Sequence, residues 1–147
     1  MKAILKSTEV RKEWSRFIDD VTRDRPALVK RNRDLIAVLS LELLDSILSE
    51  YNLTVEVKME KDGSYSGVFN EMDLMANARD IRSLEDKLAN ELIEYSKEYM
   101  DEFKIHYYSP NRKNHFPYIY RISLQSNDRE KVKKLFSISV EPAKKAS

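Results

Sequence analysis

The sequence predicts an α+β protein made of three successive segments. Apolar residues between Val10 and Val21 recur at helical spacing, residues 53–60 alternate between apolar and polar, and a longer helical repeat follows Ser83. The expected parts are a β-α-β-β-α domain (1–51), a small antiparallel β-β-α domain (52–105) and a C-terminal strand/helix segment (106–147).

The composition favours a folded protein without metal or membrane chemistry. The 147 residues are 41% hydrophobic and 35% charged. Without cysteine there is no disulfide or thiolate metal site, and His106 and His115 have no carboxylate cluster beside them. No apolar run approaches the roughly 18 residues of a membrane span, and the apolar opening is too short for a signal peptide. We expect a cytoplasmic protein with no cofactor, no metal and no membrane partner.

The net charge of +1 hides an uneven distribution along the chain. Basic residues outnumber acidic ones by ten to nine in residues 1–50 and by nine to three in residues 106–147. In residues 51–105 thirteen acidic residues stand against seven basic ones. We expect the acidic middle to face or alternate with the basic tail.

The first domain opens with a short strand and a helix. The strand covers Ala3 to Lys6, and Ser7 is predicted to cap the helix that follows. Arg25-Pro26 ends this helix, because proline cannot continue a helix and restricts the residue before it. Trp14 and Phe17 are expected to pack in the core.

A β-hairpin and a second helix complete the first domain. Two apolar runs, 27–30 and 35–39, flank the polar turn 31–34, where Asn32 can adopt the left-handed conformation. Ser40 then caps a short helix with its apolar residues on one side. These residues are Leu41, Leu44, Ile47 and Leu48.

The remaining elements are a strand pair, a long helix and a short tail. Strand 53–60 turns at Lys61-Asp62-Gly63 and pairs with a strand over 65–69. After a polar connection, Ser83 and Asp86 are predicted to form a capping box at the start of the longest helix. The C-terminal segment is expected to hold a strand over 118–124, a short basic helix capped by Asp128 and a frayed Ala/Lys/Ser end.

The first 51 residues resemble the N-terminal domain of the Phd/YefM antitoxin family. The resemblance rests on Ser7-Thr8-Glu9-Val10-Arg11 at the start of helix one, on the hairpin with its basic turn, and on Ala37-Val38-Leu39-Ser40-Leu41-Glu42 entering helix two. Trp14 stands where an aliphatic residue is common. The turn lacks the frequent glycine, so Asn32 must supply the left-handed conformation.

The middle segment is similar, more weakly, to the partial RNase H-like fold of HicB antitoxins. The shared features are an alternating strand, an Asp-Gly turn, a second strand and the helix start Ser83-Leu84-Glu85-Asp86-Lys87-Leu88-Ala89-Asn90. The glycines and the proline of the full HicB pattern are missing here.

The Phd/YefM resemblance implies a homodimer that binds operator DNA. A fifty-residue domain has too little core to be stable alone, so it is expected to bury apolar faces against a second copy. By position, Arg11 and Arg31 would contact the operator, while the N-terminus of helix one would hold a phosphate. Judged from charge alone, Arg11 is more often a solvated or salt-bridging residue, and the alternative for Arg31 and Arg33, which is the less favoured one, is that they only keep the hairpin turn soluble. The residues expected to bind DNA are Lys6, Ser7, Thr8, Arg11, Lys30, Arg31 and Arg33.

Aromatic residues cluster in the C-terminal segment. They fit a buried strand, a protein-binding surface or, less well, a base-stacking surface. If the cluster binds a toxin, the residues expected to do so are Tyr107, Tyr108, Phe116, Tyr118, Tyr120 and Arg121.

The resemblance implies a type II antitoxin that binds a cognate toxin and represses its own operon through the N-terminal domain. An enzyme is not expected, because the sequence has no Gly-rich phosphate loop, no nucleophile elbow and no histidine with an orienting acid. The alternative is a protein-interaction module without DNA binding, in which the basic residues only face solvent.

Overall fold

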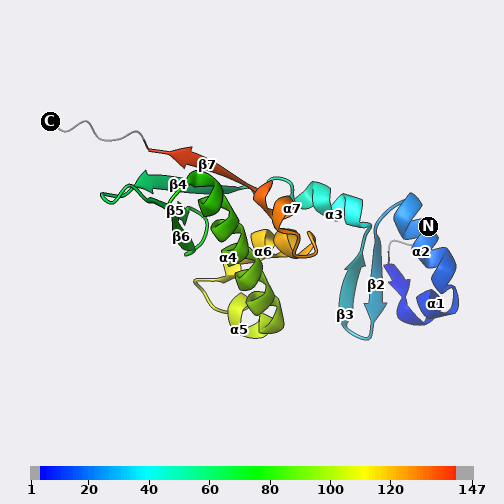
Figure 1. Cartoon of the computed structure of the whole chain (residues 1–147). Helices are drawn as coiled ribbons and strands as arrows, with labels where there is room; N and C mark the ends of the chain where they lie inside the picture. Colours follow the sequence, from blue (N-terminus) through cyan, green and yellow to red (C-terminus); the bar gives the residue numbers. More distant parts are fainter. Residues whose placement is uncertain (1–3, 142–147) are drawn as a thin grey trace. The chain divides into compact units, whose positions relative to one another are not determined.

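The computed structural model describes residues 4–141 and divides the chain into two compact units. Unit 1 is Met1–Ser49 and unit 2 is Glu50–Ser147. Both units mix helices and strands, which confirms the predicted α+β class (Figure 1). Each unit is described by itself.

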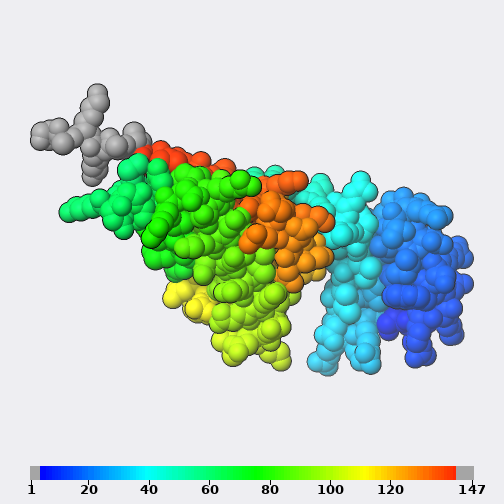
Figure 2. All heavy atoms as spheres, in the orientation of Figure 1, coloured from blue at the N-terminus to red at the C-terminus, as the bar shows by residue number. Residues whose placement is uncertain are grey.

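Unit 1 is a three-stranded sheet with two helices before its β-hairpin and one helix after it. The sheet order is β1-β2-β3, with β1 parallel to β2 and β2 antiparallel to β3. The two helices that follow β1 pack against one side of the sheet, where Val10, Phe17 and Val21 meet Val29 of β2; in Figure 2 the blue atoms of this part of the chain lie against the lighter blue hairpin. The elements are β1 (Ile4–Lys6), α1 (Ser7–Lys12), α2 (Trp14–Arg23), β2 (Ala27–Arg31), β3 (Asp34–Val38) and α3 (Leu41–Leu48).

Two of the predicted turn and capping residues of unit 1 are confirmed, and one is wrong. Asn32 has a φ of 55°, so it supplies the left-handed turn, and the Ser40 Oγ accepts a hydrogen bond from the Leu43 N–H as an N-cap. Ser7 is not a cap. It is the first residue of α1, whose N-cap is Lys6, and the helix breaks at Glu13, where φ is −120° and ψ is 46°.

The core of unit 1 is small. Its buried residues are Val10, Phe17, Val21 and Val29. Phe17 is therefore in the core as expected, but Trp14 is 57% exposed, which contradicts its predicted burial. The Trp14 ring lies 5.7 Å from that of Phe17, because the break at Glu13 places it at the rim of the helix pair.

Unit 2 is a four-stranded sheet with one long helix and several short ones. The strand order is β6-β5-β4-β7, with β7 parallel to β4 and the other pairs antiparallel (Figure 1). The elements are β4 (Leu53–Met59), β5 (Tyr65–Phe69), β6 (Met75–Ala78), α4 (Ile81–Asp101), α5 (Phe103–Tyr107), η1 (Lys113–His115), α6 (Phe116–Ser123), α7 (Arg129–Lys133) and β7 (Phe136–Val140).

The predicted strand over 118–124 is wrong, because this stretch is helix α6. Pro117 lies in the first turn of the helix, where proline is tolerated, and the fully buried Ile119 and Ile122 are spaced three residues apart on one helix face. Strands β6 and β7 were not predicted. Strand β6 lies in the polar connection before the long helix, and β7 follows the short basic helix. The predicted Ala/Lys/Ser end lies outside the described residues.

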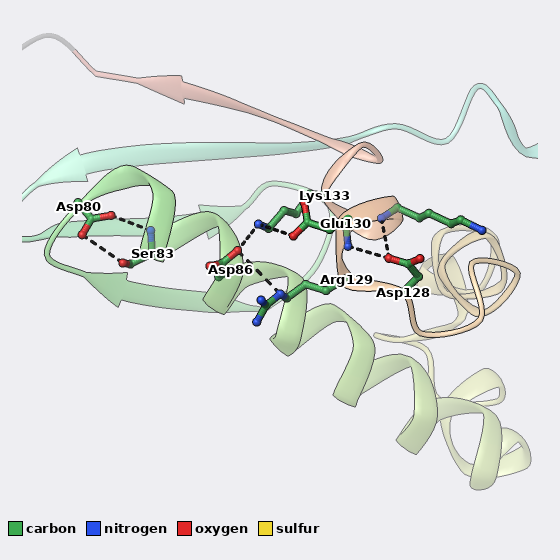
Figure 3. Close-up of polar contacts among 8 residues, drawn as sticks. Asp80, Ser83, Asp86, Asp128, Arg129, Glu130 and Lys133 are labelled. Atoms are coloured by element: carbon green, nitrogen blue, oxygen red, sulfur yellow. Dashed lines mark hydrogen bonds and ion pairs between the residues drawn. The ribbon is translucent and has the colours of Figure 1, made fainter.

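The long helix begins earlier than predicted. Its N-cap is Asp80, whose Oδ1 accepts the Ser83 N–H at 2.8 Å, so the expected capping box of Ser83 with Asp86 is wrong (Figure 3). Hydrogen bonds from the Ser83 backbone and side chain lower the pKa of Asp80. The predicted cap at Asp128 is confirmed, since its carboxylate accepts the Glu130 and Lys131 N–H groups.

One face of the unit 2 sheet packs on α4. Buried residues alternate along β4, as the sequence predicted, and meet an apolar face of the helix. Gly67 of β5 permits close packing here, because a Cβ at this position would lie 3.1 Å from Val55 Cγ1 and 3.2 Å from Leu88 Cδ1. Residues of α6 and α7 join the same core.

The basic tail folds back on the acidic middle, as the charge distribution predicted. Lys133 of α7 forms an ion pair with Asp86 of α4, and Arg129 Nε lies 3.9 Å from the same carboxylate (Figure 3). The hydrogen bond from Lys133 lowers the pKa of Asp86 and raises that of Lys133. This contact ties α7 to α4 within unit 2.

Candidate functional site

A basic groove lies at one end of the unit 1 sheet. Because β1 and β2 are parallel, their C-terminal ends lie at the same end of the sheet. There β1 leads into α1 and β2 leads into the hairpin turn. The groove has a volume of about 800 Å³. It is lined by Lys6, Ser7, Thr8, Arg11, Lys30, Arg31 and Asn32.

The groove suits an anion in both charge and exposure. Its four basic side chains are exposed, and none of its lining residues within the described part of the chain is acidic. Lys6 and Lys30 are neighbours in the β1–β2 register, so two ammonium groups project from adjacent strands. The arrangement can hold several phosphate oxygens at once.

The groove brings together six of the seven residues expected to bind DNA. Arg33 is the exception, since it lies in the hairpin turn and does not line the groove. Asn32 does line it, although the sequence indicated only its turn conformation. A polar residue beside Arg31 in a short basic turn was the available signal.

Unit 1 also exposes an apolar surface on the sheet face away from α1 and α2. Ile4 and Leu28 are register neighbours on this face, and Leu35 of β3 is 59% exposed there. Helix α3 exposes further large apolar side chains, which are Leu41, Leu43 and Ile47. Apolar side chains in such numbers are typical of an interaction surface.

Unit 2 carries an aromatic groove of about 510 Å³. Three of the residues expected to bind a toxin line it, namely Tyr107, Phe116 and Tyr118. Tyr108 stands next to this group and is 73% exposed. The other lining residues, which the sequence did not single out, are Tyr51, Glu71, Lys113, Asn114 and Pro117.

Contacts around this groove hold it in shape. Arg121, which is also expected to bind a toxin, donates to the Tyr51 carbonyl and to Asn52 Oδ1. Tyr120 does not line the groove, but its ring contacts Phe116 at 5.5 Å. Burial, followed by the charge of Glu71, raises the pKa of Tyr118.

The two histidines form hydrogen bonds inside unit 2. His106 is buried, and its Nδ1 accepts from Arg112 at 2.8 Å, because a guanidinium can only donate. His115 Nδ1 lies 2.8 Å from the Tyr95 hydroxyl, and burial lowers the pKa of His115. Both rings are used to position α5 and η1 against α4.

Comparisons with known proteins define the class. A family model described as PHD-like, antitoxin of toxin–antitoxin, RelE/RelB, TA system, matches residues 1–137. The chain therefore belongs to this antitoxin family. No functionally curated protein matches it.

A solved structure supports the same class. The crystal structure of an antitoxin from Syntrophomonas wolfei subsp. wolfei has 34% sequence identity and a TM-score of 0.87, and the match covers 96% of this chain and 100% of that chain. Among the described residues, no helix is long and apolar enough to cross a membrane.

Proposed function

We propose that this antitoxin is of the Phd/YefM type, represses its own operon through unit 1 and neutralises a cognate toxin by direct binding through unit 2. The observation that carries the first half is the basic groove, which gathers Lys6, Arg11, Lys30 and Arg31 on one exposed surface. Cations at this density neutralise backbone phosphates, and an arginine can also read a guanine edge.

Operator binding would use two copies of the groove. The exposed apolar surface of unit 1 pairs two chains and doubles the number of basic groups. The twofold arrangement then matches a palindromic operator, whose half-sites are spaced by the helical repeat of DNA.

The test is binding to the DNA upstream of the gene, followed by fluorescence anisotropy. We expect the affinity of the wild-type protein to fall by about a thousandfold or more between 50 and 200 mM salt. Arg11→Ala and Arg31→Ala each remove a contact from both copies, so each is expected to weaken binding by at least about tenfold. Arg33→Ala should weaken it less, because Arg33 lies outside the groove.

A matched control comes from the same unit. Arg23 is exposed on α2 and does not line the groove, so Arg23→Ala should leave the affinity within about twofold of wild type. Equal losses for Arg23→Ala and Arg11→Ala, or no salt dependence, would favour the protein-interaction module without DNA binding.

Toxin binding is assigned to the aromatic groove of unit 2. Tyrosine and phenylalanine are enriched at protein-binding surfaces, and tyrosine is common among hot-spot residues; Tyr51, Tyr107, Phe116 and Tyr118 line this groove. The groove is preformed, since ring contacts connect Tyr107 to Phe116 at 5.5 Å and Tyr51 to Tyr118 at the same distance.

This assignment is tested by co-expression with the product of a neighbouring toxin gene. Tyr108→Ala removes an exposed ring and should weaken toxin binding by about tenfold or more while leaving operator binding unchanged. Met75→Ala removes an exposed side chain from β6 and is the control. If both variants neutralise the toxin like wild type, the toxin binds elsewhere.

A further inference from the structure

The outer strand of the unit 2 sheet, β7, has a free edge. Its neighbour on the inner side is β4, and Figure 1 shows β7 at the border of the sheet. Two hydrogen bonds mark the ends of this pairing. Leu53 N–H donates to the Leu135 carbonyl, and Glu141 N–H donates to the Val57 carbonyl. In a parallel ladder, bonds toward one neighbour recur at every second residue. The residues with backbone groups pointing away from β4 are therefore Phe136, Ile138 and Val140.

The two edges of this sheet are protected differently. At the β6 edge, Lys87 Nζ donates to the backbone carbonyl of Asn77 at 2.9 Å, so a charged side chain covers the strand. Strand β7 has the sequence FSISV, without charge or proline. Within residues 4–141, no donor or acceptor contacts the outward backbone groups of β7. An uncharged and uncovered edge is a template for pairing with another strand.

We propose that β7 pairs in antiparallel fashion with β7 of a second copy, about a twofold axis at Ile138. Antiparallel strands exchange hydrogen bonds only between residues whose backbone groups face each other. Centring the axis on Ile138 aligns all three outward residues of both strands. A register centred on Ser137 or Ser139 aligns fewer of them. The interface is isologous, because the same edge is used by both copies.

The side chains of β7 fit this register. Val140 is 50% exposed and would lie opposite Phe136 of the second copy, on the face that packs on the core. Phe136 and Ile138 pack against the core of their own unit, so this pairing would continue an apolar row across the two copies. This complementarity of the strand with itself favours a second copy over any other occupant.

The pairing of β7 is independent of the proposed pairing of unit 1. A chain that carries both interfaces can join two unit 1 dimers without a toxin. Binding of such assemblies to adjacent operators would gain from effective concentration.

Engineered cysteines test the register in the full chain, which has no cysteine of its own. Ser137 and Ser139 are exposed on the solvent face of β7. In the proposed register they form a non-hydrogen-bonded pair across the axis, with Cα atoms about 4.5 Å apart. Identical positions lie on the diagonal at about 7 to 8 Å, beyond ordinary disulfide reach. A mixture of Ser137→Cys and Ser139→Cys chains should therefore form a disulfide-linked dimer under mild oxidation, whereas each variant alone should not.

A lysine at the end of β7 is expected to disrupt the pairing, and the same substitution on β4 is its matched control. Val140→Lys places an ammonium group opposite Phe136 of the second copy and should reduce cross-linking to the level of the single variants. Met59→Lys introduces the same charge at a residue of β4 that is 51% exposed, beyond the paired part of β7, and should leave cross-linking unchanged.

Several results would overturn the pairing. One is cross-linking by a single variant that equals that of the mixture, and another is the absence of cross-linking in the mixture. A third is that the Phe136, Ile138 and Val140 amides are protected from hydrogen exchange only after a toxin is added. The mixture is also tested with Leu35→Glu, which introduces a charge into the proposed unit 1 interface. Persistent cross-linking supports pairing through β7, whereas its loss would show that unit 1 alone brings the chains together.

Discussion

The two units of this antitoxin bury apolar surface to very different extents. Among the described residues, four buried side chains form the core of unit 1, whereas fifteen form the core of unit 2. Unit 1 nevertheless exposes eight large apolar side chains, twice the number in its buried core. They are Ile4, Trp14, Leu28, Leu35, Ile36, Leu41, Leu43 and Ile47.

This difference indicates how each unit obtains its stability. Burial of apolar surface contributes about 25 cal/mol per Å², so a core of four side chains gives little against the entropy of ordering the chain. Unit 2 closes its own core by packing α4 on one sheet face. In the proposed dimer, unit 1 would complete its core with a second copy.

The largest expected effect is a cavity in the self-sufficient unit. Leu88 is fully buried between α4 and the sheet, so Leu88→Ala should lower the free energy of unfolding of unit 2 by about 2–5 kcal/mol. Denaturant titration measures this loss. Val68→Ala, at an exposed position of β5, should cost less than about 0.5 kcal/mol. Similar losses for the two variants would contradict the assignment of the core.

The next effect concerns unit 1 and its proposed pairing with a second copy. Leu35→Glu places a carboxylate on the exposed apolar face of unit 1 and should shift the chain from dimer to monomer in sedimentation experiments. The measurement is made with Val140→Lys in both proteins, so that pairing of β7 does not contribute. Ile105→Glu alters an even more exposed apolar residue, in unit 2, and should leave the dimer intact. A dimer that survives Leu35→Glu would place the interface elsewhere.

A smaller effect is expected at the contact between α4 and α7. The pKa of Asp86 is lowered in the folded protein, chiefly by the hydrogen bond from Lys133, so its stabilising contribution is present above pH 3.8 and is lost as the pH falls through the folded pKa. Lys133→Met should therefore destabilise unit 2 at neutral pH by less than Leu88→Ala does. The difference from wild type should shrink in acid unfolding experiments below pH 3.8. A constant difference would mean that Lys133 acts by packing alone.

The smallest effect is expected from His115. Burial lowers its pKa below 6.5, so the unfolded chain binds the proton more readily and unit 2 loses stability as the pH falls from 6.5 through the folded pKa. His115→Gln keeps a polar group near the Tyr95 hydroxyl and should remove this part of the pH dependence. Thermal unfolding between pH 5 and 8 compares the two proteins, and identical pH dependence would contradict the role of His115.

Sequence reasoning located the basic groove better than the aromatic one. Strand β1, the start of α1 and the hairpin follow from short, strong signals, and the parallel β1–β2 pair then brings Lys6, Arg11 and Arg31 together. Tyr51 and Glu71 could not be found in this way. They reach the aromatic groove through tertiary packing and have no local pattern that relates them to Tyr118.

The errors in unit 2 have a common physical cause. Apolar residues around Ile119 and Ile122 suit both a short strand and a helix, and the contacts with α4 decide between them. Strand β6 has only four residues, MANA, which show no apolar alternation. Strand β7 does alternate, as FSISV, but its partner β4 lies about eighty residues earlier in the chain, so no hairpin signal marks the pair. The error at Trp14, in unit 1, has a different cause. The helix break at Glu13 has no signal in the sequence, so a continuous helix with Trp14 on its buried face is predicted.

The chain contains its own probes for the difference between the two units. Its single tryptophan, Trp14, lies in unit 1, and all eight tyrosines lie in unit 2. In the Val140→Lys protein, which leaves only the proposed unit 1 interface, denaturant unfolding is followed by both signals at several protein concentrations. If unit 1 is stabilised by a second copy, as proposed, we expect the tryptophan midpoint to fall on dilution and the tyrosine midpoint to stay constant. A tryptophan midpoint that does not depend on protein concentration would contradict this account.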